Sequence, residues 1–117
     1  MSIFDKYSLS TIAKAVDLLY QRAINSEELL PYFETINMDQ LRNHQIELLS
    51  HVMGGPITHR LTKLKIAHHE LNIPNEHFDL IAILLQQSLS DAGIESRDVK
   101  HIMDVVEGTR NQIVKAL

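Results

Sequence analysis

The sequence contains no cysteine. Its absence excludes disulfides, thiolate catalysis, iron–sulfur clusters and zinc sites built on sulfur. It also excludes attachment of a cofactor through cysteine thioethers. Any metal or prosthetic group must therefore be held by nitrogen or oxygen ligands and by noncovalent packing.

The chain also lacks a long apolar run. The first six residues form no extended apolar segment of the kind found in secretory signals, and no later run approaches the length needed to span a membrane. These features predict a cytoplasmic protein with no membrane segment.

Basic residues are not in excess, since 11 lysines and arginines face 15 aspartates and glutamates, for a formal net charge of −4. Nucleic-acid binding needs clustered positive charge to displace phosphate counterions, so this balance argues against a nucleic-acid partner. The 117 residues are 44% hydrophobic, which is enough for one domain with a sizeable core, spanning residues 1–117.

What the chain does have is helical periodicity, and no segment has the pattern of a strand. Ser8, Asn37 and Ser96 are expected N-caps, and Gly54 is expected to end a helix. A short helical turn over 27–30 should stop at Pro31. Apolar residues recur every three or four positions, as on one face of an α-helix, over residues 9–23, 38–52, 61–71, 74–92 and 96–117. The pattern predicts an all-α domain.

One histidine lies on an apolar stripe. His68 continues the spacing of Leu61, Leu64 and Leu71, whereas His69 is rotated about 100° away. An inward imidazole in a small helical domain is a candidate ligand for a buried metal or haem iron. A hydrogen-bonded core histidine is the alternative.

Three further polar residues lie on or beside apolar stripes: Tyr20, His44 and Gln45. Each has a simple explanation alone, because a tyrosine hydroxyl can reach the rim of a core and the second long helix can be rolled to expose His44 and Gln45. Together with His68 they would cost about 1–3 kcal/mol each if buried without partners. A ligand that uses all four removes that cost, and a haem iron with an oxygen-ligand site matches the groups available.

Other catalytic and metal sites fit less well. His68 and His69 are adjacent and point apart, so they cannot chelate one ion as an i, i+4 pair would. The sequence has no His-Glu-x-x-His motif and no Gly-x-Ser-x-Gly elbow. A serine–histidine–aspartate arrangement elsewhere is not excluded by composition.

Several short segments stand in a specific order along the chain: Leu18-Leu19-Tyr20, Tyr32-Phe33, Leu41-Arg42-Asn43-His44-Gln45, Gly54-Gly55-Pro56, Ala67-His68 and His77-Phe78. In that order and spacing the chain resembles the group I truncated haemoglobins over essentially its whole length. The resemblance implies a two-over-two helical sandwich that holds haem b noncovalently.

The resemblance also implies roles for individual residues. His68 corresponds to the proximal iron ligand, and Tyr20 to the tyrosine that faces the bound ligand. Phe33 and Phe78 correspond to aromatic side chains packed against the haem. Leu41, His44 and Gln45 fall at the distal helix positions, and candidate partners for the haem propionates are Arg42, Lys63 and Lys65.

His44 suggests a further feature. Some cyanobacterial members carry a histidine at this position as a sixth iron ligand, so a His68–iron–His44 state is a hypothesis for this chain. A solvent-facing His44 is the alternative.

The chain departs from the family pattern in three places. Tyr7-Ser8-Leu9 stands where the family usually has Gly-Gly, so the N-terminal turn is expected to differ. His59-Arg60-Leu61 replaces a Tyr-x-Gly motif, and Leu49 replaces a phenylalanine that lines a gas tunnel in some members. Tunnel gating therefore cannot be carried over.

The function implied is binding of dioxygen, nitric oxide or carbon monoxide by a monomer. Reversible oxygen binding and conversion of nitric oxide to nitrate use the same site, and the second also needs a reductase, so enzymatic activity is conditional. The alternative is a haem-free helical interaction or sensor-adaptor domain, which would take up no stoichiometric haem.

Overall fold

The regular elements of the structure, a computed structural model, are all helical within the residues that it describes, which are 3–34, 37–54, 73–108 and 110. The elements are α1 (Ile3–Lys6), α2 (Leu9–Ile24), the short 3-10 helix η1 (Leu30–Phe33), α3 (Met38–Val52), α5 (Asn75–Asp91) and α6 (Ser96–Glu107). The helix predicted over 61–71 lies outside the described residues.

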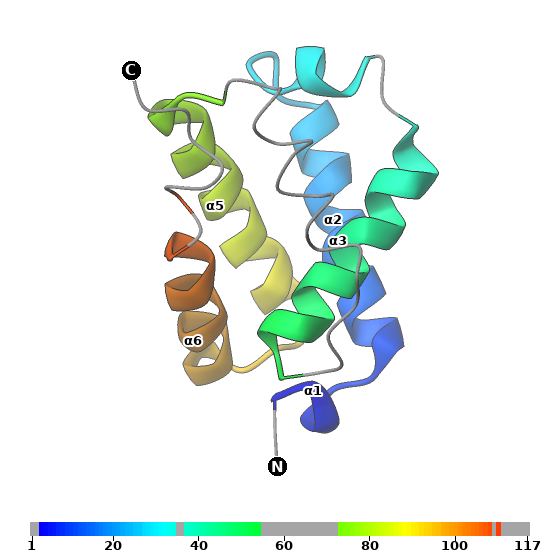
Figure 1. Ribbon diagram of the computed structural model, residues 1–117, viewed down its shortest axis with the longest axis vertical. Coiled ribbons are helices and arrows are strands. Elements are labelled where there is room, and N and C mark those ends of the chain that lie inside the picture. The colour runs from blue at the N-terminus through cyan, green and yellow to red at the C-terminus, as the bar shows by residue number, and fades with distance from the viewer. Residues whose placement is uncertain (1–2, 35–36, 55–72, 109, 111–117) are drawn as a thin grey trace.

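The long helices form two packed pairs, α2 with α3 and α5 with α6 (Figure 1). The two pairs meet where α2 packs against α5. This arrangement confirms the prediction of an all-α, two-over-two sandwich. It places the inner face of α2 at the centre of the molecule, where it contacts both neighbours.

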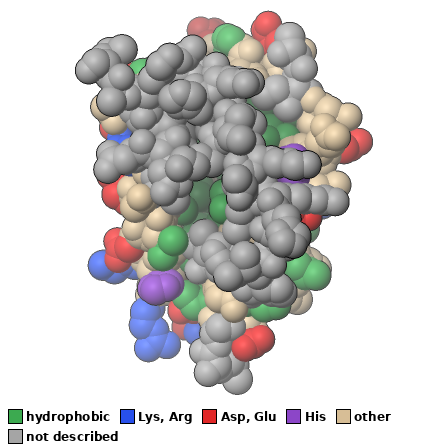
Figure 2. Space-filling model, viewed as in Figure 1, with side chains coloured by type: hydrophobic (Ala, Val, Ile, Leu, Met, Phe, Trp, Pro, Cys, Tyr) green, Lys and Arg blue, Asp and Glu red, His purple; other side chains and the backbone are tan. Residues whose placement is uncertain are grey.

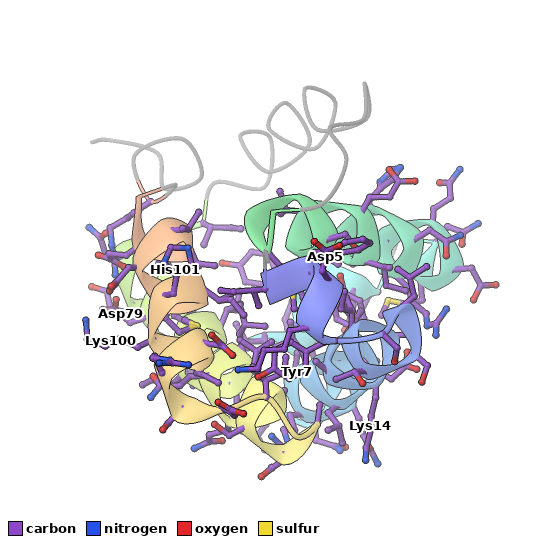
Figure 3. All side chains as sticks on the ribbon, turned by 90° about the horizontal axis from the view of Figure 1, so that it is seen from below. Asp5, Tyr7, Lys14, Asp79, Lys100 and His101 are labelled. Carbon is purple, nitrogen blue, oxygen red and sulfur yellow. The ribbon has the colours of Figure 1, made fainter. Side chains whose placement is uncertain are left out.

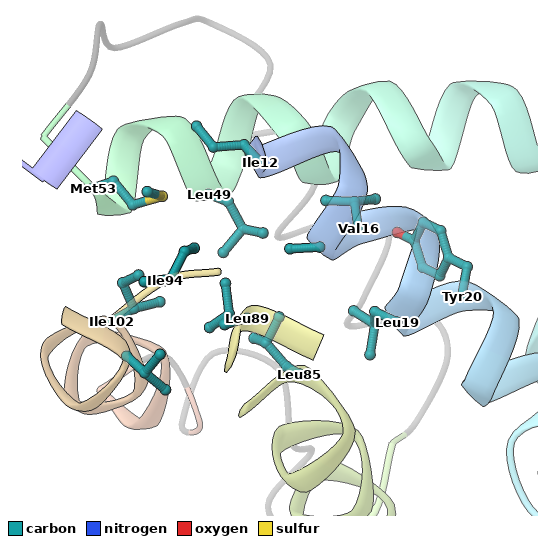
Figure 4. Close-up of a cluster of buried hydrophobic side chains, with 12 residues drawn as sticks. Ile12, Val16, Leu19, Tyr20, Leu49, Met53, Leu85, Leu89, Ile94 and Ile102 are labelled. Atoms are coloured by element: carbon teal, nitrogen blue, oxygen red, sulfur yellow. The ribbon is translucent and has the colours of Figure 1, made fainter. Parts of the chain in front are cut away.

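The core is built from the apolar stripes of all four long helices. Tyr20 lies at one end of the cluster, and Met53 and Ile102 lie toward the other (Figure 4). Burying one such aliphatic side chain contributes about 1.5–3 kcal/mol. The cluster comprises Ile12, Ala15, Val16, Leu19, Tyr20, Leu49, Met53, Leu85, Leu89, Ile94, Val99 and Ile102.

Three predicted helix ends are confirmed. The Ser8 hydroxyl accepts a hydrogen bond from the Thr11 amide at 3.2 Å, which caps α2. The Asn37 side chain accepts one from the Gln40 amide at 3.2 Å at the start of α3. Gly54, with a φ of 93°, follows α3 in the left-handed conformation that glycine adopts at little cost.

Two other boundaries differ from the sequence prediction. Pro31 does not stop the short helix but lies within its first turn, where the missing amide hydrogen has no helical partner to lose. Glu95, not Ser96, is the N-cap of α6. α6 ends at Glu107 with Gly108 as its C-cap, and residues 111–117 of the helix predicted over 96–117 lie outside the described residues.

The N-terminal segment forms a short helix, α1, and residues within and beside it are bonded to residues near the ends of α3 and α6. The Phe4 amide donates to the Met53 carbonyl at 2.6 Å. The Tyr7 hydroxyl donates to Asp98 Oδ2 at 2.7 Å and accepts from the Glu95 amide at 3.0 Å. The view from below places Tyr7 next to α1 at this end of the molecule (Figure 3). These bonds fasten α1 to the end of α3 and the start of α6.

The surface of the described residues carries charges of both signs. Figure 2 shows acidic and basic side chains at several places around the edge of one face. In the part of the chain that the structure describes, no helix combines the length and the apolar character needed to cross a membrane.

Candidate functional site

Tyr20 lies where the sequence placed it, on the inner face of α2. The residue is only 9% exposed, and its hydroxyl donates to the Leu41 carbonyl across 3.4 Å. Burial raises the pKa of the phenol, which keeps it a neutral donor. A contact of this length is weak, since hydroxyl hydrogen bonds are usually about 2.7–2.8 Å. The buried hydroxyl is therefore only partly satisfied by the described residues.

Phe33 meets Tyr20 from η1. The ring centroids are 5.9 Å apart and the planes are inclined by 65°, an edge-to-face contact. Phe33 and Leu41 are both half-buried and pack against the core cluster. Tyr20, Phe33 and Leu41, predicted to line one site, thus come together from three separate helices.

His44 and Gln45 follow Leu41 by three and four positions on α3. Residues at these spacings lie on the same face of an α-helix. Both side chains belong to half-buried residues, so they lie neither in the sealed core nor fully in solvent. Both polar residues thus share one face of α3 with Leu41 and are partly accessible.

Arg42 has a partner that the sequence did not indicate. Its Nε lies 2.6 Å from Asp17 Oδ1 and its Nη2 lies 3.1 Å from Oδ2, a two-point ion pair between α3 and α2. Hydrogen bonding to Asp17 raises the pKa of Arg42. A propionate held by Arg42 would have to share or displace Asp17.

Phe78 is buried on α5, apart from the cluster that contains Tyr20. The Arg110 guanidinium carbon lies 4.4 Å from the centre of its ring, a cation–π contact. Arg110 also donates to Asp79 Oδ1 at 2.5 Å and to Asn75 Oδ1 at 3.1 Å. Phe78 is thus held at the start of α5 from the C-terminal side of α6.

The remaining predicted site residues, Lys65 and His68, lie outside the described residues, as does Lys63. Within the described ranges, no group of three or more histidine, aspartate or glutamate side chains is arranged to hold a metal ion.

Sequence reasoning missed a second pair of contacts. Tyr32 Oη lies 2.5 Å from His77 Nδ1, and the two rings pack edge to face. His77 Nε2 lies 3.9 Å from Glu28 Oε2. The sequence places Tyr32 and His77 each directly before a phenylalanine, but it gives no sign that the two polar rings meet.

The arrangement around Tyr20 fits a flat apolar cofactor that carries a small polar ligand. Phe33 and Leu41 offer apolar surface, and the incompletely satisfied Tyr20 hydroxyl offers a hydrogen-bond donor inside it. A buried donor of this kind lowers its free energy when it meets an acceptor.

Comparisons with known proteins find relatives that match nearly the whole chain. The family model for the bacterial-like globins matches residues 2–115. Group 1 truncated hemoglobin of Tetrahymena thermophila is 27% identical over 110 residues, covering 93% of this chain and 91% of the relative. Group 1 truncated hemoglobin GlbN of Nostoc sp. is 29% identical over 103 residues, covering 88% of this chain and 87% of the relative.

Solved structures show the same likeness. The crystal structure of truncated hemoglobin from Tetrahymena pyriformis in its Fe(III) form superposes with a TM-score of 0.87 at 26% identity, covering 99% of this chain and 100% of that one. Hemoglobin from Chloroflexus aurantiacus shares the fold, with a TM-score of 0.83 at 18% identity, covering 99% of each chain.

Proposed function

Because this chain belongs to the bacterial-like globin family and resembles its group 1 truncated hemoglobins, we propose that it binds haem b noncovalently through His68. We propose further that the haem iron binds dioxygen, nitric oxide or carbon monoxide on the side of Tyr20. The globin family itself implies a haem cofactor and small diatomic ligands. The family does not by itself assign His68 as the iron ligand or Tyr20 as the residue beside the bound gas, and we propose both roles.

The observation that carries the proposal is the Tyr20 hydroxyl. It is enclosed by apolar residues, yet its one described hydrogen bond, to the Leu41 carbonyl, is 3.4 Å long. A tyrosine used only for packing gains little from such a hydroxyl, since phenylalanine would fill the same space without a polar atom to satisfy. A polar ligand beside Tyr20 accounts for it.

When bound, the haem supplies an iron centre that takes up a diatomic ligand. The chain supplies the surroundings. Tyr20 and Gln45 would donate hydrogen bonds to that ligand, and one such bond contributes about 0.5–1.5 kcal/mol, or about 1.5–3 kcal/mol where the acceptor carries charge. Phe33 and Leu41 keep water from the donor atoms. The neutral state of Tyr20, favoured by its burial, preserves its proton for donation.

His44 is proposed as a second protein ligand of the iron in the absence of a gas. Its place on the Leu41 face of α3 and its half-buried position support this role. An external ligand would then wait for His44 to leave, and its apparent affinity would fall in proportion to the fraction of open sites.

Two activities follow from one site: reversible oxygen binding, and conversion of nitric oxide and oxygen to nitrate with electrons from an external reductase. The test is spectroscopic. The haem-loaded protein is reduced without oxygen, exposed to oxygen or carbon monoxide, and purged. A reversible change in the visible spectrum is expected. Protein that takes up no haem would support a haem-free interaction domain, and irreversible oxidation on first exposure to oxygen would remove oxygen binding.

A further inference from the structure

The polypeptide offers few side chains that lose a single electron readily. It has no cysteine and no tryptophan, and its three tyrosines are Tyr7, Tyr20 and Tyr32. Among its side chains, a one-electron oxidant therefore removes an electron from a tyrosine most easily. A phenol that has lost an electron is a strong acid. The tyrosine with a base beside it can pass on its proton, so the radical is most stable on that tyrosine.

Tyr20 has no such base among the described residues. Its hydroxyl contacts the Leu41 backbone carbonyl at 3.4 Å, and an amide oxygen does not hold a proton at neutral pH. Its burial also separates it from water. Oxidation there would leave a positive charge in an apolar environment, which is costly.

Tyr7 has a weak base. Its hydroxyl donates to Asp98 Oδ2 at 2.7 Å, and Lys6 Nζ lies 2.9 Å from the same oxygen. These two hydrogen bonds hold the pKa of Asp98 below its ordinary value, Tyr7 contributing the larger effect. A carboxylate so stabilised takes up the phenol proton poorly.

Tyr32 has the strongest base of the three. Its Oη lies 2.5 Å from His77 Nδ1, and an imidazole nitrogen is a stronger base than a carboxylate or a backbone carbonyl. Glu28 Oε2 lies 3.9 Å from Nε2, and acceptance of the Tyr32 proton at Nδ1 uses the tautomer that carries its own proton on Nε2. The same carboxylate stabilises the imidazolium once Nδ1 is protonated.

We infer that Tyr32 and His77 form a redox-active pair, at which one-electron oxidation of this protein settles. Tyr32 gives one electron to a one-electron oxidant, which is reduced by that electron. The phenol O–H bond breaks and an N–H bond forms at His77 Nδ1. The products are a neutral tyrosyl radical and an imidazolium beside Glu28. An electron from an external reductant and return of the same proton restore the starting state.

The position of Tyr32 and His77 suits transfer of an electron from this pair to an oxidant formed at the Tyr20 site. Tyr32 is half-buried and its neighbour Phe33 contacts Tyr20, so the pair is one residue removed from the Tyr20 site along the chain. The source of such an oxidant in a haem protein is peroxide, and this part of the inference rests on the proposed function. The redox pair itself does not require haem.

The experiment uses a photogenerated ruthenium(III) polypyridyl complex as the one-electron oxidant, on haem-loaded full-length protein. Samples frozen after illumination are measured by electron paramagnetic resonance. The variants are Tyr32→Phe and His77→Leu, with Tyr7→Phe as the matched control that removes the other half-buried phenol. Circular dichroism confirms that each variant is folded. Electron–nuclear double resonance, compared between ordinary and deuterated water, measures the exchangeable proton that is hydrogen-bonded to the radical oxygen.

Wild type and Tyr7→Phe are expected to give the same tyrosyl signal, with a strongly coupled exchangeable proton. Tyr32→Phe should lose most of that signal, and His77→Leu should lose the proton coupling and shorten the radical lifetime severalfold. A wild-type signal that persists in Tyr32→Phe, or no tyrosyl signal in wild type, overturns the inference. Because the oxidant acts without haem, failure of haem binding appears separately, in the absorption spectrum of the same samples.

Discussion

The hydroxyl of Tyr20, on α2, faces the backbone carbonyl of Leu41, on α3, across 3.4 Å. This contact joins the two helices that would enclose a ligand, and it is too long to satisfy the hydroxyl fully. The same donor can therefore turn to a better acceptor without breaking a strong bond. A tyrosine bonded at 2.7 Å to a buried carboxylate would not have that freedom.

Replacement of Tyr20 by phenylalanine is expected to speed oxygen release. Loss of a hydrogen bond of about 1.5–3 kcal/mol corresponds to an increase of about ten- to a hundredfold in the dissociation rate. Stopped-flow mixing of the oxygenated protein with carbon monoxide measures that rate. Tyr7→Phe, which removes a phenol at the opposite part of the fold, serves as the control. Equal oxygen dissociation rates in wild type and Tyr20→Phe would show that Tyr20 does not hydrogen-bond the bound oxygen.

His44→Ala tests the second proposed iron ligand. If His44 binds the iron, the ferric wild type is low-spin and six-coordinate, and the variant becomes high-spin. The measurement is the visible spectrum of both proteins, with binding of carbon monoxide to the ferrous forms followed by flash photolysis. Faster, single-phase binding is expected in the variant because no internal ligand has to leave. A wild-type protein that is already high-spin would show that His44 does not bind the iron.

Variants of Arg42 and Asp17 test whether Arg42 holds a haem propionate or serves only in its ion pair with Asp17. The pair is largely exposed, so its contribution to the free energy of unfolding is expected to be small. If Arg42 also holds a propionate, Arg42→Gln releases haem faster, whereas Asp17→Asn does not. Transfer of haem to excess apomyoglobin measures the release rate. Equal acceleration in both variants would indicate that the ion pair acts only by joining α2 to α3.

Asp98 should make the fold sensitive to acid. Hydrogen bonds from Tyr7 and Lys6 lower its pKa in the folded state below the ordinary value of 3.8, which an unfolded chain would show. The stabilisation is therefore complete well above that value and is lost as the pH falls through the folded-state pKa. Urea unfolding as a function of pH compares wild type with Asp98→Asn. Their difference in unfolding free energy should shrink with acidification; a difference independent of pH would contradict the assignment.

The features that could be predicted from the sequence are those that depend on residues close together in the chain. Ser8 and Asn37 cap the helices that follow them, and Gly54 ends α3, because each effect acts within one turn of the chain. The apolar stripe of α2 likewise predicted the burial of Tyr20. These features need no knowledge of what packs where.

Contacts between distant residues could not be read in the same way. Tyr32 and His77 are 45 positions apart, and Tyr7 and Asp98 are 91 apart. Periodicity places a side chain on a face of its helix, but not opposite a particular partner on another helix. The resemblance named Phe33 and Phe78 as haem contacts, and only the fold reveals that the rings of Tyr32 and His77, which precede them, pack together.

Haem titration of wild type and His68→Gly, each with and without added imidazole, tests the central claim most directly. We expect saturable uptake of one haem per wild-type chain, with a spectrum typical of nitrogen-ligated iron. In His68→Gly the iron should lose its protein ligand on that side, and imidazole should restore the carbon monoxide spectrum of the ferrous protein. No saturable uptake by wild type, or a His68→Gly spectrum identical to that of wild type, would contradict the account.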